Sequence, residues 1–263
     1  MLKIDINSDL GEGFGIYQAA DDDAILSLVS SANIACGFHA GDPVIMDRTV
    51  RRALQLGVDV GAHVGYADRQ GFGRRAMTMD RRELELMTLY QLGALRAIAE
   101  AAGHRMTHAN FHGALGNLSF VDAEVADALL GAMRAFDRDL AFVALPNTEA
   151  ERAAQRHGLR VVRSFLADRA YDRRGLLVSR ATPGSMVKDP QAIRDRVIRM
   201  IQAGEIETIE GDVIPMKAES ILVHSDTPGA VRLGETIQAA VLEAGAQICL
   251  LYTSPSPRDR TRS

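Results

Sequence analysis

The 263-residue chain contains no tryptophan, only two cysteines and 5% aromatic residues. Binding platforms for polysaccharides or single-stranded nucleic acids depend on stacked aromatic side chains, so this composition argues against both ligand classes. Cys36 and Cys249 lie far apart and form no Cys-x-x-Cys motif, which excludes a structural zinc knuckle. A disulfide between them is not expected in a reducing compartment.

The chain also lacks an excess of positive charge and a long apolar segment. Its 30 Lys and Arg residues stand against 34 Asp and Glu residues, a formal net charge of −4, which does not favour a nucleic-acid partner. A membrane span would need a run of about 18 apolar residues, and a signal peptide would need a basic segment before an apolar one. Neither pattern occurs, so we expect a cytoplasmic protein that binds neither nucleic acid nor membrane.

The apolar content is sufficient for one large core. Hydrophobic residues make up 47% of the chain and charged residues 24%, and α/β barrels commonly reach this length as a single domain. We therefore predict one domain over residues 1–252. Residues 253–263 are polar, contain proline and are rich in arginine, so we expect a disordered tail. The tail resembles translated adapter or vector sequence, and we predict that it is not native.

Short strand-like segments alternate with amphipathic helical patterns along the chain. We predict strands at residues 4–7, 32–36, 58–62, 106–110, 140–145, 159–162, 220–223 and 247–251. We predict helices at residues 24–29, 44–55, 80–102, 122–136, 148–157, 190–203 and 228–244. Residues 207–215 resemble a small hairpin.

This alternation predicts a parallel sheet, either closed into a barrel or open and doubly wound. No Gly-x-Gly-x-x-Gly follows the first strand and no Walker loop occurs, so the sequence lacks the signs of an open nucleotide-binding sheet. We predict an irregular, seven-stranded, TIM-like (β/α) barrel with the hairpin outside it.

One motif repeats at the ends of the predicted strands. The apolar run from Ala32 breaks at Gly37 and is followed by His39 and Asp42, directly before Pro43, which suits the first turn of a helix. Other strands also end in glycine and ionisable side chains, namely Asp9, Glu12, His63, His112 and His224. The carboxyl ends of parallel strands lie on one face of such folds, where their sites are found.

Imidazoles and carboxylates that converge in this way allow two kinds of chemistry. They can bind a divalent cation, usually zinc at nitrogen-rich sites, and Asp9, His63 and His112 are the candidate ligands. Alternatively they act as general acid and base, because histidine titrates near neutral pH. The chain has no His-Glu-x-x-His motif, and the residues do not separate the two interpretations.

Two long loops, residues 65–75 and 165–175, carry several arginines. Arg75 and Arg169 stand beside glycine or beside acidic and aromatic residues, where a forked guanidinium group could hold a carboxylate or a phosphate. We expect Arg173 and Arg174 to be solvated surface residues.

Four motifs together resemble the LamB/YcsF family. They are Asn7-Ser8-Asp9-Leu10-Gly11-Glu12-Gly13-Phe14-Gly15, Asn33-Ile34-Ala35-Cys36-Gly37-Phe38-His39-Ala40-Gly41-Asp42-Pro43, residues 61–75, and Ala167-Asp168-Arg169-Ala170-Tyr171. The resemblance covers the chain from about residue 3 to 250. It implies an irregular β/α barrel similar to the glycoside hydrolase and polysaccharide deacetylase superfamily.

The resemblance also implies an activity, that of the A subunit of an ATP-dependent 5-oxoprolinase. This enzyme opens the lactam of 5-oxo-L-proline to L-glutamate, with ATP and Mg²⁺ as co-substrate and with B and C subunits as partners. The resemblance does not decide whether the chain forms a homo-oligomer or whether its site binds a divalent cation. ATP has a chemical role here, because phosphorylating the oxygen of an unreactive lactam makes it a better electrophile.

On this interpretation the strand-end residues divide into two groups. Asp9, His63 and His112 activate water or hold a cation, while His39 and Asp42 serve as acid and base. The residues expected to bind the substrate are Glu12, Arg75, Asp168, Arg169 and His224.

The chain departs from the family at two positions of one motif. Asn110 and Gly116 stand where the family usually has a lysine and a tyrosine, so another lactam substrate stays open. Two other function classes also stay open. One is a metal-dependent amidohydrolase or deacetylase that acts without ATP, and the other is a non-catalytic sugar-binding or scaffold subunit.

Overall fold

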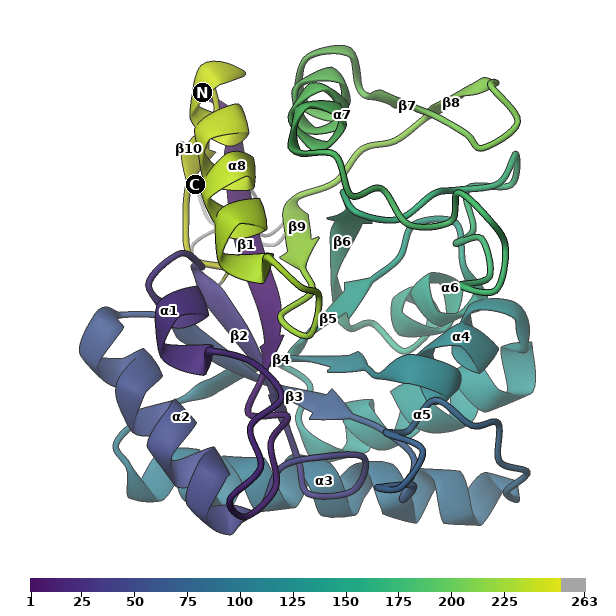
Figure 1. The fold of residues 1–263 in the computed structure, drawn as a ribbon. Helices are drawn as coiled ribbons and strands as arrows, with labels where there is room; N and C mark the ends of the chain where they lie inside the picture. Colours follow the sequence, from purple (N-terminus) through teal and green to yellow (C-terminus); the bar gives the residue numbers. More distant parts are fainter. Residues whose placement is uncertain (252–263) are drawn as a thin grey trace, which may run out of the picture.

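The computed structural model describes residues 1–251, which fold around a closed barrel of seven parallel strands (Figure 1). The barrel strands are β1 (Lys3–Leu10), β2 (Ser31–Ala35), β3 (Asp59–Val64), β4 (Met106–Phe111), β5 (Ala141–Ala144), β6 (Arg160–Leu166) and β9 (Ser220–Val223). Each pairs with its neighbour in this order, and β9 also pairs with β1, which closes the ring. The predicted seven-stranded barrel is confirmed. The predicted tail at 253–263 lies outside the described residues.

Three shorter strands lie outside the ring. β7 (Glu205–Glu207) and β8 (Val213–Pro215) form an antiparallel hairpin apart from the barrel, as predicted. Gly211 has a φ of 87° in the connection between them, a conformation that suits glycine. β10 (Gln247–Ile248) runs parallel to β1 at Lys3 and Ile4 and is shorter than the predicted strand.

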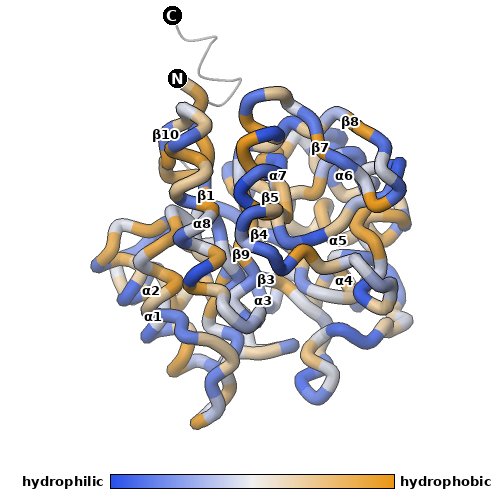
Figure 2. Tube along the Cα trace, turned by 45° about the horizontal axis from the view of Figure 1, so that its top comes forward, coloured by the Kyte–Doolittle hydropathy of each residue, from blue (hydrophilic) through white to orange (hydrophobic). Residues whose placement is uncertain are grey.

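Helices surround the barrel, with hydrophobic and hydrophilic residues alternating along them (Figure 2). They are α1 (Asp22–Leu26), α2 (Pro43–Leu56), α3 (Arg81–Ala101), α4 (Gly113–Val121), α5 (Ala123–Phe136), α6 (Glu149–Arg156), α7 (Pro190–Ala203) and α8 (Ala230–Glu243). The sequence did not predict α4. Its N-cap, His112, makes no side-chain capping hydrogen bond, so the usual signal for a helix start is absent. Among residues 1–251 no helix is both long and apolar enough to cross a membrane.

Aspartate side chains set the starts of the longer helices. Asp42, Asp80 and Asp122 each accept hydrogen bonds from backbone N–H groups in the first turn of α2, α3 and α5. Gly57, at a φ of 69°, ends α2 in the left-handed conformation. The caps at Asp42 and Asp80 fix where the loops after β2 and β3 end at the carboxyl face of the barrel.

The barrel interior is unusually polar along β1. Asp5, Asn7 and Asp9 are spaced two apart and therefore share one face of the strand. Asn7 donates to Ser220 Oγ at 2.6 Å, and Asn33 donates to Asn7 at 2.7 Å and to Asp9 at 3.0 Å. A continuous hydrogen-bonded column thus links the amino end of β1 to the carboxylate of Asp9 at the carboxyl face.

At the base of this column, Asp5 is fully buried and accepts hydrogen bonds from the hydroxyl groups of Ser30, Ser31 and Ser220. Burial raises the pKa of Asp5 to about 6, although the three hydroxyl groups oppose the shift. The unfolded chain loses this proton near pH 4, whereas the folded chain keeps it until near pH 6. Asp5 therefore stabilises the fold in acid, and this contribution is lost as the pH rises through the folded pKa.

We expect Asp5→Asn to remove this part of the pH dependence. In the wild-type chain Asp5 should lower the free energy of unfolding by about 3 kcal/mol between about pH 4 and pH 7, since one pKa unit corresponds to about 1.4 kcal/mol. Urea unfolding of both chains across this range measures the difference. Asp47→Asn, at a partly exposed position on α2, serves as the control. Equal pH dependence of wild type and Asp5→Asn would contradict the assignment.

Candidate active site

Four buried polar side chains meet at the carboxyl end of the barrel. Glu12 follows β1, His39 follows β2, His63 lies near the end of β3 and His112 follows β4. The Oε1 atom of Glu12 lies 3.1 Å from His39 Nε2, 3.7 Å from His63 Nε2 and 3.3 Å from His112 Nδ1. All four donor atoms lie within 4.8 Å of one another. We call these residues the histidine–glutamate cluster.

The loop after β3 holds the imidazole rings in place. A Cβ atom at Gly65 would lie 2.5 Å from His39 Nδ1, and one at Gly73 would lie 2.7 Å from His39 Cβ, so only glycine fits at either position. The rings of His39 and His112 stack at a centroid distance of 3.9 Å and an interplanar angle of 7°. Backbone contact on one side and stacking on the other therefore restrict both rings.

Hydrogen bonds outside the cluster set the tautomers of two histidines. His63 Nδ1 lies 2.6 Å from the side-chain oxygen of Asn110, and His112 Nε2 lies 2.7 Å from the carbonyl oxygen of Phe72. These oxygens only accept, so the two ring nitrogens carry the protons. The lone pairs of His63 Nε2 and His112 Nδ1 then face each other at 2.9 Å. Such an arrangement needs a positive species between them, either a proton or a metal ion.

The cluster could hold a divalent metal ion. Ligands at about 2.0–2.1 Å from a tetrahedral ion are separated from one another by about 3.3 Å. The distances of 3.1–3.7 Å from Glu12 Oε1 to the three imidazole nitrogens lie near this value, and the whole set lies within 4.8 Å, so a bound ion would draw the widest pair together. Three nitrogens and one carboxylate oxygen form a donor set that suits zinc and similar ions.

The histidines of the cluster have the protonation state that a metal site needs, whereas Glu12 would have to lose a proton to bind a cation. Burial, followed by the nearby Asp9 carboxylate, raises the pKa of Glu12 well above its usual range. Burial and the neighbouring imidazoles lower the pKa values of His39 and His112 well below theirs. Both histidines are therefore neutral near pH 7, which is the form of imidazole that binds metals.

We expect the purified chain to bind one Zn²⁺ or Co²⁺ ion, and His63→Ala to weaken this binding by at least about 100-fold. Loss of an outer-shell partner alone typically costs 10–100-fold in metal affinity, and His63 supplies a ligand atom. Isothermal titration calorimetry, together with the visible spectrum of the Co²⁺ form, measures the effect. His157→Ala is the matched control, because His157 pairs with Asp127 on the surface. Unchanged affinity in His63→Ala would contradict the site.

A second polar group comes from the other half of the barrel. His224 follows β9 and Asp168 follows β6, and His224 Nδ1 lies 2.8 Å from Asp168 Oδ2. Arg169, beside Asp168, is buried and donates to the carbonyl oxygen of Val178 at 2.6 Å. We call Asp168 and His224 the acid pair.

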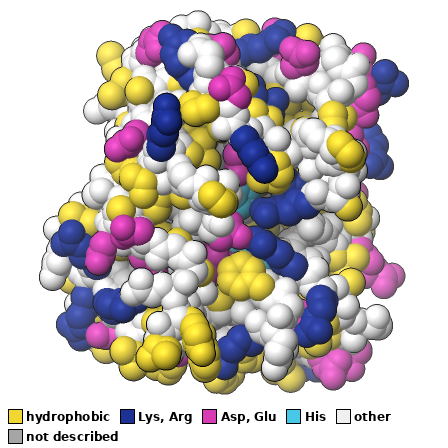
Figure 3. Space-filling model, in the orientation of Figure 1, with side chains coloured by type: hydrophobic (Ala, Val, Ile, Leu, Met, Phe, Trp, Pro, Cys, Tyr) yellow, Lys and Arg dark blue, Asp and Glu magenta, His cyan; other side chains and the backbone are white. Residues whose placement is uncertain are grey.

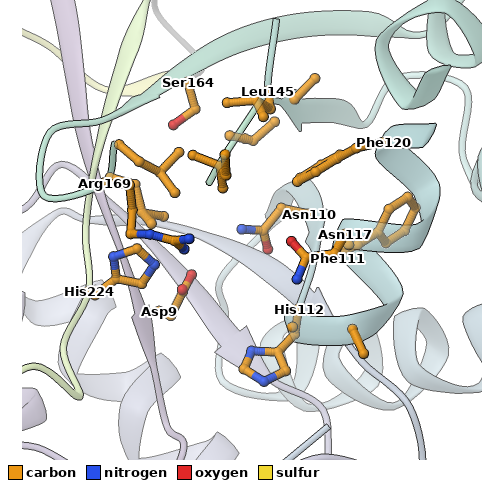
Figure 4. A pocket seen from close by; sticks show the side chains of 18 of the residues that line it. Asp9, Asn110, Phe111, His112, Asn117, Phe120, Leu145, Ser164, Arg169 and His224 are labelled. Carbon is orange, nitrogen blue, oxygen red and sulfur yellow. The ribbon is translucent and has the colours of Figure 1, made fainter. Parts of the chain in front are cut away.

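A cavity of about 600 Å³ lies over both groups. Figure 3 shows it as a hollow in one face, bordered by basic and acidic side chains with a histidine visible inside. Asp9, His112 and His224 lie together in the close-up, and Ser164, Leu145 and Phe120 lie across from them (Figure 4). Within residues 1–251, Ser164 Oγ and Arg169 Nε are buried without a hydrogen-bond partner. Both residues line the cavity, so these two atoms mark where a polar ligand group would bind.

Six of the predicted site residues line this cavity, namely Asp9, Glu12, His63, His112, Arg169 and His224. His39 and Asp168 are buried behind it, against Glu12 and His224, and Asp42 and Arg75 do not reach it. The Asp42 carboxylate accepts from the backbone N–H groups of Val44 and Ile45 at 2.9 Å and of Gly15 at 2.8 Å, so it caps α2 and anchors a loop. Arg75 pairs with Asp68 and leaves 66% of its side chain exposed. The acid/base role of Asp42 and the substrate-binding role of Arg75 stay predictions that no contact with the cavity supports.

The cavity also contains residues that the sequence did not single out. Arg74, not its neighbour Arg75, faces the cavity and pairs with Asp226 at 2.5 Å. Which of two adjacent loop residues points inward depends on backbone turns that no periodicity reveals. Asn110, which the sequence marks only as a departure from the family motif, also lines the cavity, and its side-chain oxygen lies 2.6 Å from His63 Nδ1. Asp9, a predicted metal candidate, lies 3.6 Å from His63 Nε2 but outside the four-residue cluster.

Comparisons with known proteins agree with this architecture. The model of the LamB/YcsF family matches residues 4–255. The chain is 52% identical over 247 residues to a 5-oxoprolinase A subunit of Bradyrhizobium diazoefficiens, covering 94% of this chain and 97% of the relative. It is 55% identical over 247 residues to a 5-oxoprolinase A subunit of Ralstonia nicotianae, covering 94% and 95%.

A solved structure shows the same fold. The lactam utilization protein of Thermus thermophilus superposes with a TM-score of 0.91 at 40% sequence identity. The match covers 95% of this chain and 100% of that protein. The barrel and its strand-to-helix loops are thus shared over the whole length of that relative.

Proposed function

This chain belongs to the LamB/YcsF family, and from that premise we propose that it is the A subunit of a 5-oxoprolinase. The proposed reaction opens the lactam of 5-oxo-L-proline to L-glutamate and is coupled to ATP hydrolysis. The observation that carries the proposal is the 52% identity over 97% of a relative named as this subunit. The proposed partners are the B and C subunits that the name implies.

The two polar groups of the cavity suit the two ends of this substrate. 5-Oxoproline has a carboxylate and, across the ring, a lactam carbonyl. The buried guanidinium of Arg169 and its unpartnered Nε suit the carboxylate, while the histidine–glutamate cluster faces the carbonyl. A metal ion held by the cluster would make a bound water acidic enough to attack at neutral pH. Where no ion is bound, the inward lone pair of His63 Nε2 is instead placed to accept the proton of an attacking water.

ATP has a chemical reason to take part. Lactams are poor electrophiles, and phosphorylation of the lactam oxygen makes the carbon easier to attack. We assign no residue of this chain to ATP or to Mg²⁺, and we propose both as co-substrates of the assembled enzyme.

We expect Arg169→Gln to raise the KM for 5-oxoproline by about 10–100-fold. A hydrogen bond to a charged group contributes about 1.5–3 kcal/mol, and the variant removes the charge that would hold the carboxylate. The KM for 2-pyrrolidinone, which has no carboxylate, should change little. Arg173→Gln is the matched control, since Arg173 lies on the same loop but pairs with Asp212 at the surface. Equal KM changes for both lactams would contradict this role.

The test of the proposed function is the release of glutamate and phosphate from 5-oxoproline and ATP. It is run with the purified chain alone and then with the B and C subunits of a family complex. Coupled release in equal amounts would establish the reaction. No release from a folded chain with both partners would refute it, and other lactams would then be screened because of Asn110 and Gly116 in the cavity wall.

A second candidate is a metal-dependent amidohydrolase that needs no ATP, and the four-residue metal-capable cluster favours it. Turnover of a lactam or N-acyl substrate without nucleotide, lost on chelation and restored by Zn²⁺, would decide for this candidate.

A further inference from the structure

The acid pair differs from the cluster in the way its imidazole is held. His224 Nδ1 lies 2.8 Å and 3.0 Å from the two oxygens of the Asp168 carboxylate. A carboxylate only accepts, so Nδ1 carries a proton and Nε2 is the ring nitrogen left for the cavity. Figure 4 shows the ring beside Arg169 and Asp9, with Asp9 between His224 and His112. The imidazoles of His224 and His112 therefore lie on different sides of Asp9, and both border the same cavity.

The charges around His224 favour a second proton on its ring. Burial lowers the pKa of His224, but the Asp168 carboxylate and then Asp9 outweigh burial, and the net pKa is raised. At this end of the barrel the pKa of the acid-pair imidazole is thus raised, while the pKa values of His39 and His112 in the cluster are lowered. Opposite shifts in neighbouring groups are typical of an acid and a base that work together. The charged or titratable groups that act on His224 are Asp168, Arg180, Asp9, Asp226 and His112, and Arg169 lies beside its ring (Figure 4).

We propose that His224 is the general acid of the reaction and donates its Nε2 proton to the ring nitrogen of the lactam as the carbon–nitrogen bond breaks. Asp168 is then a positioning residue, because it holds the ring through Nδ1 and does not touch the substrate. This inference rests on the proposed lactam hydrolysis and adds the source of the proton that ring opening requires.

The step balances as follows in atoms and charge. The oxygen of water forms a bond to the carbonyl carbon and loses a proton to the cluster. The bond from that carbon to the ring nitrogen breaks, and its electron pair stays on nitrogen, which takes the proton from His224 Nε2. An amide nitrogen leaves poorly without a proton, whether or not the carbonyl oxygen has first been phosphorylated. In the phosphorylated case the carbon–nitrogen cleavage leaves an acyl phosphate, and a second water molecule must hydrolyse it to release phosphate. His224 ends neutral, still hydrogen-bonded to Asp168.

The experiment compares His224→Gln and Asp168→Asn in the assembled enzyme. His224→Gln should lower kcat by about 10²–10⁴-fold, the usual contribution of a general acid, with a smaller effect on KM. In the wild type, kcat should fall on the alkaline side as His224 loses its proton. Asp168→Asn should move this limb to lower pH by about one unit or more, since an adjacent opposite charge shifts a pKa by 1–3 units.

The surface pair His157 and Asp127 provides the matched control. His157 Nε2 lies 2.9 Å from Asp127 Oδ1, so the pair is chemically alike but lies outside the cavity. His157→Gln and Asp127→Asn should leave kcat and the pH profile unchanged. Thermal unfolding of all four variants identifies any that fail to fold.

Nitrogen NMR of the histidine side chains gives a reading that does not depend on turnover. Comparison of the wild-type and His224→Gln spectra assigns the His224 signal. In the wild type at pH 7, this signal should have the chemical shift of an imidazolium. A neutral His224, a wild-type kcat in folded His224→Gln, or an unmoved alkaline limb in Asp168→Asn would each overturn the inference. Absence of lactam turnover in the wild-type complex would instead overturn the proposed function.

Discussion

Replacing His112 by alanine is expected to lower turnover of the assembled enzyme by about 10³-fold or more while the chain keeps its fold. The side chain supplies the Nδ1 lone pair that faces His63 at 2.9 Å and Glu12 at 3.3 Å, and its ring stacks on His39. Its loss removes one donor of the cluster and frees the neighbouring ring, and removal of one well-placed polar group in an active site commonly costs 10²–10³-fold or more. His39→Ala should behave alike. The measurement is kcat for glutamate release.

His104→Ala is the control for this prediction. His104 precedes β4 at the opposite end of that strand and contacts the carbonyl oxygen of Val58. Its loss should leave kcat unchanged, and near-ultraviolet circular dichroism should show native packing in all three variants. Wild-type turnover by His112→Ala would show that the histidine–glutamate cluster takes no part in the reaction.

Replacing Gly61 by alanine is expected to destabilise the fold by about 4 kcal/mol, because overpacking a core costs about 1–3 kcal/mol and a broken buried hydrogen bond adds to it. A Cβ atom at this position of β3 would lie 2.2 Å from His108 Cδ2 and 2.4 Å from Nε2. His108 is fully buried, and its Nε2 lies 3.0 Å from Asn33 Oδ1, so the ring cannot move without losing this contact.

Gly93→Ala, in the middle of α3, is the matched control, and it should raise the free energy of unfolding instead of lowering it. A Cβ atom there meets nothing within 4 Å, so the variant should gain up to about 1 kcal/mol from helix propensity. Urea unfolding at one pH compares the two. Equal effects of Gly61→Ala and Gly93→Ala would show that the barrel interior accommodates the extra methyl group.

Most of the barrel was predictable because its signals are local. The apolar runs that became β2, β3 and β9 end at glycine or at polar residues, and Asp42, Asp80 and Asp122 mark helix starts by capping. α4 was missed because its start has no capping side chain. The short β10 shows a further limit, since its bounds depend on which residues of β1 remain free to pair.

The sequence predicts which strands contribute to the candidate site, but it predicts the individual site residues less well. Histidines at the ends of β2, β3, β4 and β9 necessarily reach one face once the strands are parallel. Whether Arg74 or Arg75 faces the cavity depends on the turn around Gly71 and Gly73, which only the folded loop determines. The role of Asp42 was ambiguous, because an aspartate directly before Pro43 fits both a helix cap and a catalytic motif. In the structure its carboxylate oxygens accept hydrogen bonds from nearby backbone N–H groups, so it is a cap.

The order of the polar residues along the chain has a consequence for biosynthesis. All four cluster residues lie within the first 112 positions, His63 on β3 and the others just after β1, β2 and β4, whereas Asp168 and His224 come from the second half. The pairing that closes the barrel joins Asp5 to Ser220. A ribosome therefore releases the imidazole and carboxylate donors long before the strand that encloses them, and such distant pairings form late. The nascent half-barrel therefore exposes four metal-capable side chains before the strands that bury them in the finished protein have been made.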